Sequence, residues 1–304
     1  MTTVNVPTAQ FGGVLMILMS LVGLFFNISA FYQYVSLEKT SFHIMCISKT
    51  ISNSLHLLVY LGYNGPSALL GTQIGPDILN RYLNQAIAYG LYCQGPLTQA
   101  LITINRFLIV YFQPVIIPWY SKWITSGALF FCWIIAFYFS TLIGFPESCL
   151  IKFSPQKLTW IHEECPFFIS YVLQSDFLYL ILPLGVFSNC MNIFIAFKLF
   201  LLSKSQCLST ESSRQRQRTT IRLFIQNCFE DWIYVLDTVN SLFIKDTVND
   251  GFVIFLVTLG SNLVTQVADG FVMFISNYQQ MRKQRVSSAQ VRYLNPLGPL
   301  KPIN

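Results

Sequence analysis

Charged residues are scarce in this sequence, and their scarcity excludes a water-soluble protein. Asp, Glu, Lys and Arg make up only 11% of the 304 residues, whereas 53% are hydrophobic. Soluble domains carry about 25% charged residues, so this charge would not cover the surface of a soluble globule. The apolar residues also come in long runs, which indicates that lipid surrounds much of the chain. The net charge of +6 does not indicate nucleic-acid binding, because most basic residues fall on one predicted membrane face.

Histidine is also rare, and the cysteines follow no metal-binding pattern. The three histidines lie far apart, and the eight cysteines include no Cys-x-x-Cys pair. Metal sites bring such ligands close together, so we predict no metal site and no cofactor. The sequence also has no paired-metal Asp motif, no His-Glu metal helix and no nucleophile elbow. We therefore predict no catalytic residues and a protein that is not an enzyme.

Seven apolar segments predict an all-α bundle of transmembrane helices. A helix needs about 20 mostly apolar residues to cross the hydrocarbon. Four segments meet this alone, at about 11–34, 123–145, 168–202 and 252–276. Three others carry polar groups that neighbouring helices must shield, at about 42–63, 84–112 and 220–244. We expect no soluble domain in the longest connections, at about 65–83 and 146–167.

The basic residues predict how the bundle is oriented. The first ten residues contain neither Lys nor Arg. Seven spans with an outer amino terminus would place 14 of the 19 basic residues on the cytoplasmic side, four outside and Lys49 within a span. Because cytoplasmic loops carry the excess of Lys and Arg, we expect the amino terminus outside and the carboxyl terminus inside. The receptor domain would cover 1–276, and the basic tail 277–304 would form a short amphipathic helix and then be disordered.

Two basic features mark the predicted cytoplasmic ends of the helices. The triplet Asn105, Arg106 and Phe107 closes the third segment, where an Arg is costly unless it faces the bundle interior or water. Taken alone, Arg106 would be an ordinary positive-inside anchor. Four further arginines precede or begin the sixth segment: Arg214, Arg216, Arg218 and Arg222. They are candidates for contact with a G protein or anionic lipid, or form a basic cluster with no specific partner.

Several polar residues lie inside the predicted spans and are candidates for an internal network: Asn27, Lys49, Asn53, Glu230, Asp231 and Asp269. Ionisable groups within a membrane are candidates for function by default. A transporter or channel would use the acids for ion coupling, whereas a receptor would use them in a polar network or to hold a ligand. Lys49 would either pair with an acid or snorkel to the inner face. The sequence leaves these alternatives open.

Two groups of residues belong to the predicted outer half. Six are candidates for a ligand pocket by their predicted depth: Tyr89, Tyr92, Cys93, Asp176, Asp237 and Asn240. For each of them taken singly, ordinary helix packing is the more frequent role. Cys149 and Cys165 share the second outer loop, where an oxidising environment favours a disulfide over two free thiols.

The order and spacing of these features resemble the rhodopsin-type receptors and, more narrowly, the nematode serpentine receptor class X (Srx) chemoreceptors. The passages that carry the resemblance are TSFHIMCISKTISNSLHLL, TINRFLIVYFQP and VADGFVMFISNYQQMRK. The triplet ending in Phe107 resembles the acidic-Arg-aromatic motif of such receptors, with Asn105 in the acidic place. The resemblance implies a chemosensory receptor for a small-molecule cue that signals through a heterotrimeric G protein. It also implies a multi-pass protein of the plasma membrane, in the cilium of a sensory neuron.

Three departures from the wider receptor pattern are visible. No Cys stands at the outer start of the third segment, where Arg81 lies, so the Cys149–Cys165 pair would replace the usual bridge. The sixth segment has no Pro. Asp269 and the following Gly stand where an Asn-Pro or Asp-Pro pair is expected, with Met273 in place of a Tyr. The alternative to a receptor is a small transporter or ligand-gated channel that uses the intramembrane carboxylates.

Overall fold

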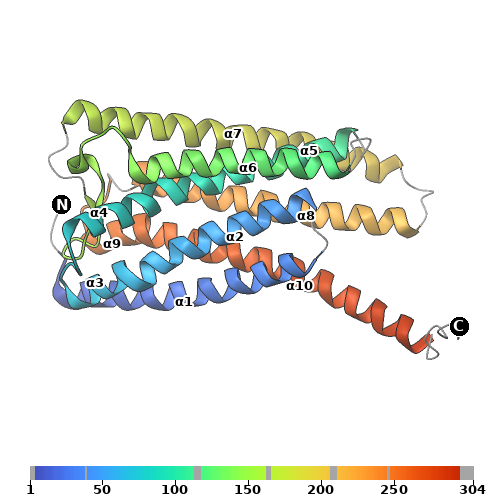
Figure 1. The fold of residues 1–304 in the computed structure, drawn as a ribbon, viewed down its shortest axis with the longest axis horizontal. Coiled ribbons are helices and arrows are strands. Elements are labelled where there is room, and N and C mark those ends of the chain that lie inside the picture. Colours follow the sequence, from blue (N-terminus) through green and yellow to red (C-terminus); the bar gives the residue numbers. More distant parts are fainter. Residues whose placement is uncertain are drawn as a thin grey trace, which may run out of the picture.

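Long helices run side by side along one axis, as Figure 1 shows. The computed structural model describes residues 4–37, 40–112, 118–161, 166–205, 211–244 and 247–294. Within these helices, only the backbone is described over 118–121, 167–179, 202–205, 211–220, 242–243 and 279–294. The described chain forms seven helical rods, and several rods consist of consecutive segments with a π-helical turn between them.

The first three rods lie before residue 113. They are α1 (Val6–Ser36); α2 (Ser41–Val59) with η1 (Tyr60–Asn64) and α3 (Gly65–Leu70); and α4 (Asp77–Gln85) with η2 (Ala86–Gly90) and α5 (Leu91–Phe112). The last four are α6 (Pro118–Thr141); α7 (Phe167–Ser205); α8 (Glu211–Val239) with η4 (Asn240–Ile244); and α9 (Gly251–Phe255) with η6 (Leu256–Gly260) and α10 (Ser261–Leu294).

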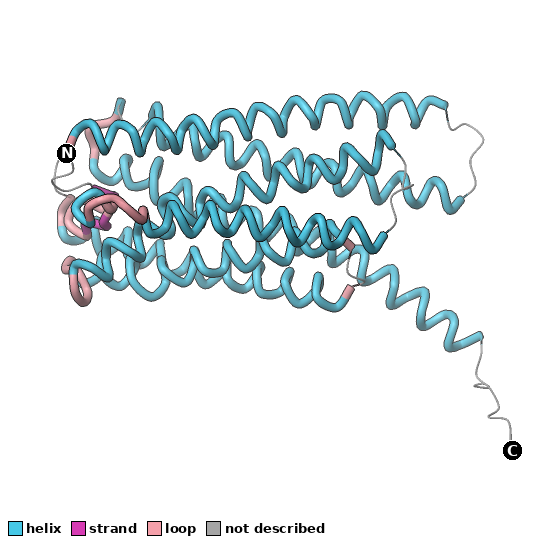
Figure 2. The backbone as a smooth tube through the Cα atoms, turned by 45° about the horizontal axis from the view of Figure 1, so that its top comes forward, coloured by secondary structure: helices cyan, strands magenta, loops and turns pink. Residues whose placement is uncertain are grey.

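The two ends of the bundle differ. One end, here called the hairpin end, carries α3, α4, α9 and the short strands β1 (Lys152–Ser154) and β2 (Thr159–Ile161). At the other end, here called the tail end, α10 extends well beyond its neighbours (Figures 1 and 2). The first described residues of α1 lie at the hairpin end, so the chain enters and leaves the bundle at opposite ends. This is the arrangement that an odd number of spans requires.

Five helical stretches are long and apolar enough to cross a membrane by length and composition, among the described residues: Val6–Ser36, Ser41–Leu70, Lys122–Thr141, Leu180–Leu201 and Gly251–Tyr278. The second segment is among them by length and composition, but its polar groups Lys49, Asn53 and His56 are buried, and 56% of its most apolar window lies inside the bundle, as expected of a segment that neighbouring helices shield. Over their described residues, the third and sixth rods are not apolar enough to meet this criterion of length and composition. Their polar residues face the bundle interior, where other helices shield them.

Some helix boundaries differ from those that hydropathy predicts. The fourth segment is expected to end near 145, but α6 ends at Thr141, because Leu142 and Gly144 adopt left-handed backbone conformations with φ of 45° and 98°. The third rod begins at Asp77, seven residues before its predicted start, and the seventh continues to Leu294 instead of ending near 276. Hydropathy finds the membrane-embedded part of a helix, whereas hydrogen bonds and helix propensity continue it into the polar region.

Glycines allow the first rod to pack closely on its neighbours. A Cβ placed on Gly13 would lie 2.6 Å from the backbone N of Leu69 and 2.8 Å from the carbonyl O of Gly65. These are backbone atoms of α3, which cannot rotate away as a side chain can. Small residues at such contacts let helices approach in lipid, where packing and not the hydrophobic effect drives association.

The hairpin closes over its end of the bundle because polar side chains of α4 pair with its backbone. Asn80 accepts from the Phe153 N–H and donates to the Phe153 carbonyl, both at 3.0 Å. Gln85 accepts from the Ile151 N–H at 3.0 Å. These buried amides hold the hairpin against α4, which is helical in a stretch where the sequence predicts a connection.

An ion pair on the exposed side of the hairpin adds to this closure. Arg81 Nε lies 2.6 Å from Asp77 Oδ2, and Lys152 Nζ lies 3.4 Å from Asp77 Oδ1. Partial burial by itself raises the pKa of the Asp77 carboxyl, but Arg81 and Lys152 outweigh it, so that pKa lies below its ordinary value. Cys149, just before β1, is in a disulfide. Cys165 lies outside the described residues, so its pairing with Cys149 stays a prediction.

Candidate functional site

A buried lysine lies at the centre of the bundle. Lys49 on α2 has no exposed surface, and its Nζ lies 2.8 Å from Glu230 Oε2 on α8 and 2.7 Å from Asp269 Oδ1 on α10. The same Nζ donates to Gln99 Oε1 on α5 at 2.8 Å. Asn53, one turn along α2, donates to Asp269 Oδ2 at 2.5 Å. One ammonium therefore joins four helices, and Lys49 pairs with acids in the bundle instead of snorkelling.

A chain of amides extends this centre toward α7. Gln99 Nε2 donates to Asn227 Oδ1 at 2.8 Å, and Asn227 Nδ2 donates to Asn192 Oδ1 at 3.1 Å. Asn192 Nδ2 in turn donates to Asp231 Oδ2 at 2.5 Å. Every member of this chain is buried. The two adjacent carboxylates of α8 thus have different partners, since Glu230 faces Lys49 and Asp231 faces α7.

The residues predicted from the sequence include the charged members of this network and Asn53, but not four of its other amides. Gln99, Asn192, Gln226 and Asn227 carry hydrogen bonds that link one charged group to the next. The sequence contains a signal for two of these amides. Gln226 lies four residues before Glu230, and Asn227 lies four residues before Asp231, so each amide shares a helix face with its acid. Asn27 lies apart from this network and donates to the Gly23 and Gln266 carbonyls.

Arg106 lies near the tail end of α5 and points into the bundle. Only 6% of its surface is exposed, and its guanidinium carbon lies 4.0 Å from the centre of the Phe42 ring on α2. Among the described residues no carboxylate pairs with it, and its Nε and Nη2 have no hydrogen-bond partner. Asn105 has no carboxylate to pair with Arg106, and the guanidinium contacts the aromatic face of Phe42 instead.

The other predicted G-protein contacts are described only in part. Phe107 stacks on Tyr111, with ring centres 4.4 Å apart, and both pack on the α7 cluster of Ile195 and Leu199. The Asn105 side chain is partly buried. Arg222 is half-buried on α8, whereas the side chains of Arg214, Arg216 and Arg218 lie outside the described residues.

Asp237 occupies the hairpin-end half of α8 and is almost fully buried. Tyr92, Ser261 and Asn262 are its polar neighbours, but neither carboxylate oxygen accepts a hydrogen bond of ordinary geometry from the described residues. Around it, Asn240 Nδ2 donates to Ser261 Oγ at 3.0 Å, and the Tyr92 hydroxyl lies 3.1 Å from the hydroxyl oxygen of Thr238. The structure therefore brings three of the six predicted pocket residues together.

The other three predicted pocket residues lie elsewhere. Tyr89 and Cys93 pack in an apolar cluster with Phe139 of α6 and Leu142, away from Asp237. The side chain of Asp176 on α7 lies outside the described residues. Depth along a helix was predictable for Tyr89 and Cys93, but the direction in which each side chain points depends on where the neighbouring helices lie.

These features define a class of fold, the seven-helix bundle of rhodopsin type. The chain superposes on squid rhodopsin with a TM-score of 0.67, over 99% of this chain and 90% of that one, at 11% sequence identity. At this identity the likeness concerns the fold, and the predicted seven-helix bundle is confirmed. No curated protein matches the chain significantly.

Residues 17–277 match the family described as "Serpentine type 7TM GPCR chemoreceptor Srx". The match covers most of the 304 residues, and the chain belongs to this family. It is therefore a multi-pass membrane receptor of the G-protein-coupled kind and not an enzyme. The family resemblance found in the sequence is confirmed.

Proposed function

We propose that this receptor binds a small molecule at Asp237 and signals through a heterotrimeric G protein at the tail end. The amino terminus would lie outside the cell and the tail end in the cytoplasm. The observation that carries the ligand site is the buried Asp237 carboxylate, which has no cation beside it among the described residues. A buried carboxylate without a partner is costly, and a ligand with an ammonium group would supply the missing charge.

The surrounding geometry supports a site at this depth. Besides Tyr92 and Asn240, Tyr60 donates its hydroxyl to Asn262 at 3.1 Å, and the ring of His56 stacks on Tyr60 with centres 5.5 Å apart. Four rods also contain a π-helical turn toward the hairpin end, at η1, η2, η4 and η6. Such turns insert one residue into a helix and frequently occur at functional sites. A polar, aromatic-lined centre of this kind suits a small molecule better than an ion alone.

A continuous set of contacts connects this site to the buried Lys49 at the centre of the bundle. The rings of Tyr92 and Tyr234 meet edge to face, with centres 6.4 Å apart, and Lys49 Nζ lies 5.3 Å from the centre of the Tyr234 ring. Lys49 then pairs with Glu230. A ligand that attracts Asp237 would move α8 relative to α5 and so bias this ion pair. The shift in population would equal the difference in ligand affinity between the two arrangements.

Arg106 would be the element that the G protein meets. In the described arrangement its guanidinium lies against Phe42 and is buried, so it is not available at the surface. Activation would release it toward the cytoplasm, where Arg222 and the arginines before it on α8 would lie nearby. Phosphate groups of anionic lipids would compete for the same basic face.

The burial of the acids argues against the transporter or channel. Glu230 and Asp269 are occupied by Lys49, so these two carboxylates are not free to carry an ion. A direct test is the current or flux of Asp237→Asn and Glu230→Gln in membranes without G protein. We expect none in these variants or in the parent protein. A current lost in either variant would favour the channel.

The ligand site is tested with a G-protein reporter and matched small molecules. Cells that express the receptor and a promiscuous Gα subunit would be exposed to sets of small amines, alcohols and carboxylic acids of equal size. We expect responses from amines, lost in Asp237→Asn and kept in Asp250→Asn. Asp250 is a suitable control because its side chain caps α9 by accepting from Phe252 and Val253, which Asn also does. A full response of Asp237→Asn would refute the site.

The orientation is tested with one epitope tag on each terminus. Staining before and after permeabilisation should find the amino-terminal tag outside and the carboxyl-terminal tag inside. An inside amino terminus would place Arg106 outside the cell and would end the receptor proposal in this form.

A further inference from the structure

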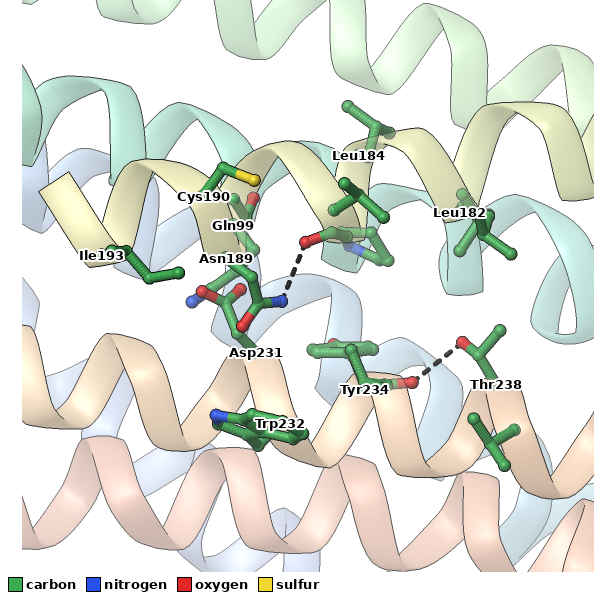
Figure 3. Close-up of a pocket in the computed structure, with 17 residues that line it drawn as sticks. Gln99, Leu182, Leu184, Asn189, Cys190, Ile193, Asp231, Trp232, Tyr234 and Thr238 are labelled. Atoms are coloured by element: carbon green, nitrogen blue, oxygen red, sulfur yellow. Dashed lines mark hydrogen bonds between the residues drawn. The ribbon is translucent and has the colours of Figure 1, made fainter.

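A cavity of about 340 Å³ lies between α5, α7 and α8 (Figure 3). It is distinct from the Asp237 site, because Asp237 does not line it. Pro96 and Gln99 line it from α5, Gly185 and Ser188 from α7, and Asp231 from α8. The volume lies within the range of small-molecule sites, about 300–1,000 Å³.

The mouth of this cavity faces lipid. Val186 and Ile193 of α7 and Trp232 of α8 line it and are 57%, 68% and 59% exposed. These large apolar side chains lie midway along helices of a bundle that crosses a membrane, so hydrocarbon and not water surrounds them. A molecule would therefore enter sideways, from the bilayer, between α7 and α8.

The inner wall of the cavity is polar and buried. Gln99, Ser188 and Asp231 are each at least 95% buried. Asp231 accepts from Asn192 at 2.5 Å and from Asn227 at 3.5 Å, and both bonds end on Oδ2. Gln99 is a further amide neighbour of Asp231, and no Lys or Arg among the described residues pairs with this carboxylate.

A second polar group beside the cavity also has unused capacity. The hydroxyl of Tyr234, which lines the cavity, is buried and has no hydrogen-bond partner in the described part of the chain. Figure 3 shows Asp231 and Tyr234 on successive turns of α8, on the side of the cavity opposite α7. Buried polar groups normally find partners, so the Tyr234 hydroxyl and the Asp231 carboxylate, whose charge no cation balances, point to a bound molecule.

We propose that this cavity binds an amphiphile dissolved in the bilayer, with an amine head at Asp231 and an alkyl tail between α7 and α8. The charge argues for the amine. Among the described residues Asp231 has amide donors but no Lys or Arg partner, since the ammonium of Lys49 is held by Glu230 and Asp269. An ammonium would pair with the Asp231 carboxylate, whereas a fatty acid would place a second carboxylate there. This site goes beyond the proposed function and does not depend on it.

The test uses the full-length receptor in vesicles of neutral phosphatidylcholine. The probe is dodecylamine with a photoreactive diazirine at the end of its tail, and labelled residues are mapped by mass spectrometry. We expect labels on the facing parts of α7 and α8, near Val186 and Trp232. Plain dodecylamine should compete with the probe at least about ten-fold better than dodecanoic acid does, since a hydrogen bond to a charged group contributes about 1.5–3 kcal/mol. Dodecanol should fall between them.

Three variants make the result decisive. Val186→Trp fills the mouth without touching Asp231 and should lower labelling several-fold, whereas Val22→Trp on the exposed face of α1 should leave it unchanged. Asp231→Asn should remove the preference for amine over alcohol. Labels spread evenly over α1 and α6, or equal competition by amine and acid, would overturn the proposal. Unchanged labelling in Val186→Trp would overturn it even if Asp231→Asn fails to fold.

Discussion

The pairing of one lysine with two acids predicts an unusual order of stabilities. Replacing Lys49 by Met leaves Glu230 and Asp269 buried near each other without a cation, although both lay within 2.8 Å of its Nζ. Breaking a buried ion pair by removing one partner costs about 3–5 kcal/mol. Removing one acid is different, because the charge of Lys49 is still balanced by the charge of the remaining acid. Glu230→Gln or Asp269→Asn alone should therefore cost clearly less than Lys49→Met.

The assay is thermal unfolding of the purified receptor in lipid nanodiscs. At about 2 °C per kcal/mol, Lys49→Met should lower the melting temperature by roughly 6–10 °C. The triple variant Lys49→Met, Glu230→Gln, Asp269→Asn should recover most of this loss, because neutral replacements of a buried ion pair are often tolerated. The reasoning fails if Lys49→Met melts with the parent protein, or if either acid variant is the least stable of the set.

Three further predictions concern other parts of the bundle. Phe42→Leu removes the ring against Arg106, a contact of about 0.5–2 kcal/mol, and should raise ligand-independent G-protein activation; unchanged basal activity would contradict it. Gly13→Ala meets the backbone of α3 and should cost about 1–3 kcal/mol, whereas Gly62→Ala, with no atom within 4 Å of its Cβ, should cost far less in the same melting assay. Cys149→Ser removes a disulfide and should cost about 2–5 kcal/mol, and equal melting of the reduced and oxidised parent protein would argue against a structural role.

Two sites of different access follow from the arrangement of α8. Asp237 faces the bundle interior beside Tyr92 and Asn262, whereas Asp231, six residues earlier, faces α7 and the lipid-facing cavity. Glu230, directly before Asp231, faces Lys49. The three carboxylates of α8 thus lie in three different environments. The charge of each can be removed by a separate substitution. The reporter assay and the photolabelling assay would fail independently of each other.

The sequence alone determined the seven apolar segments and the family. Long apolar runs leave few alternatives, because a chain in hydrocarbon must satisfy its backbone within each helix. The inward position of Arg106 was also predictable, since an Arg at that depth must avoid lipid. The pairs Gln226–Glu230 and Asn227–Asp231 were visible as amides one turn from acids.

Only the tertiary structure decided which of these groups meet. Lys49 and Glu230 are 181 residues apart, and no pattern in either helix indicates the other. Tyr89 and Cys93 share the predicted depth of Tyr92, yet they face α6 while Tyr92 approaches Thr238. Periodicity gives the face of a helix that carries polar residues, but the rotation and spacing of seven packed helices set which faces touch. That packing depends on the contacts of all seven rods together, so it cannot be derived from any one segment.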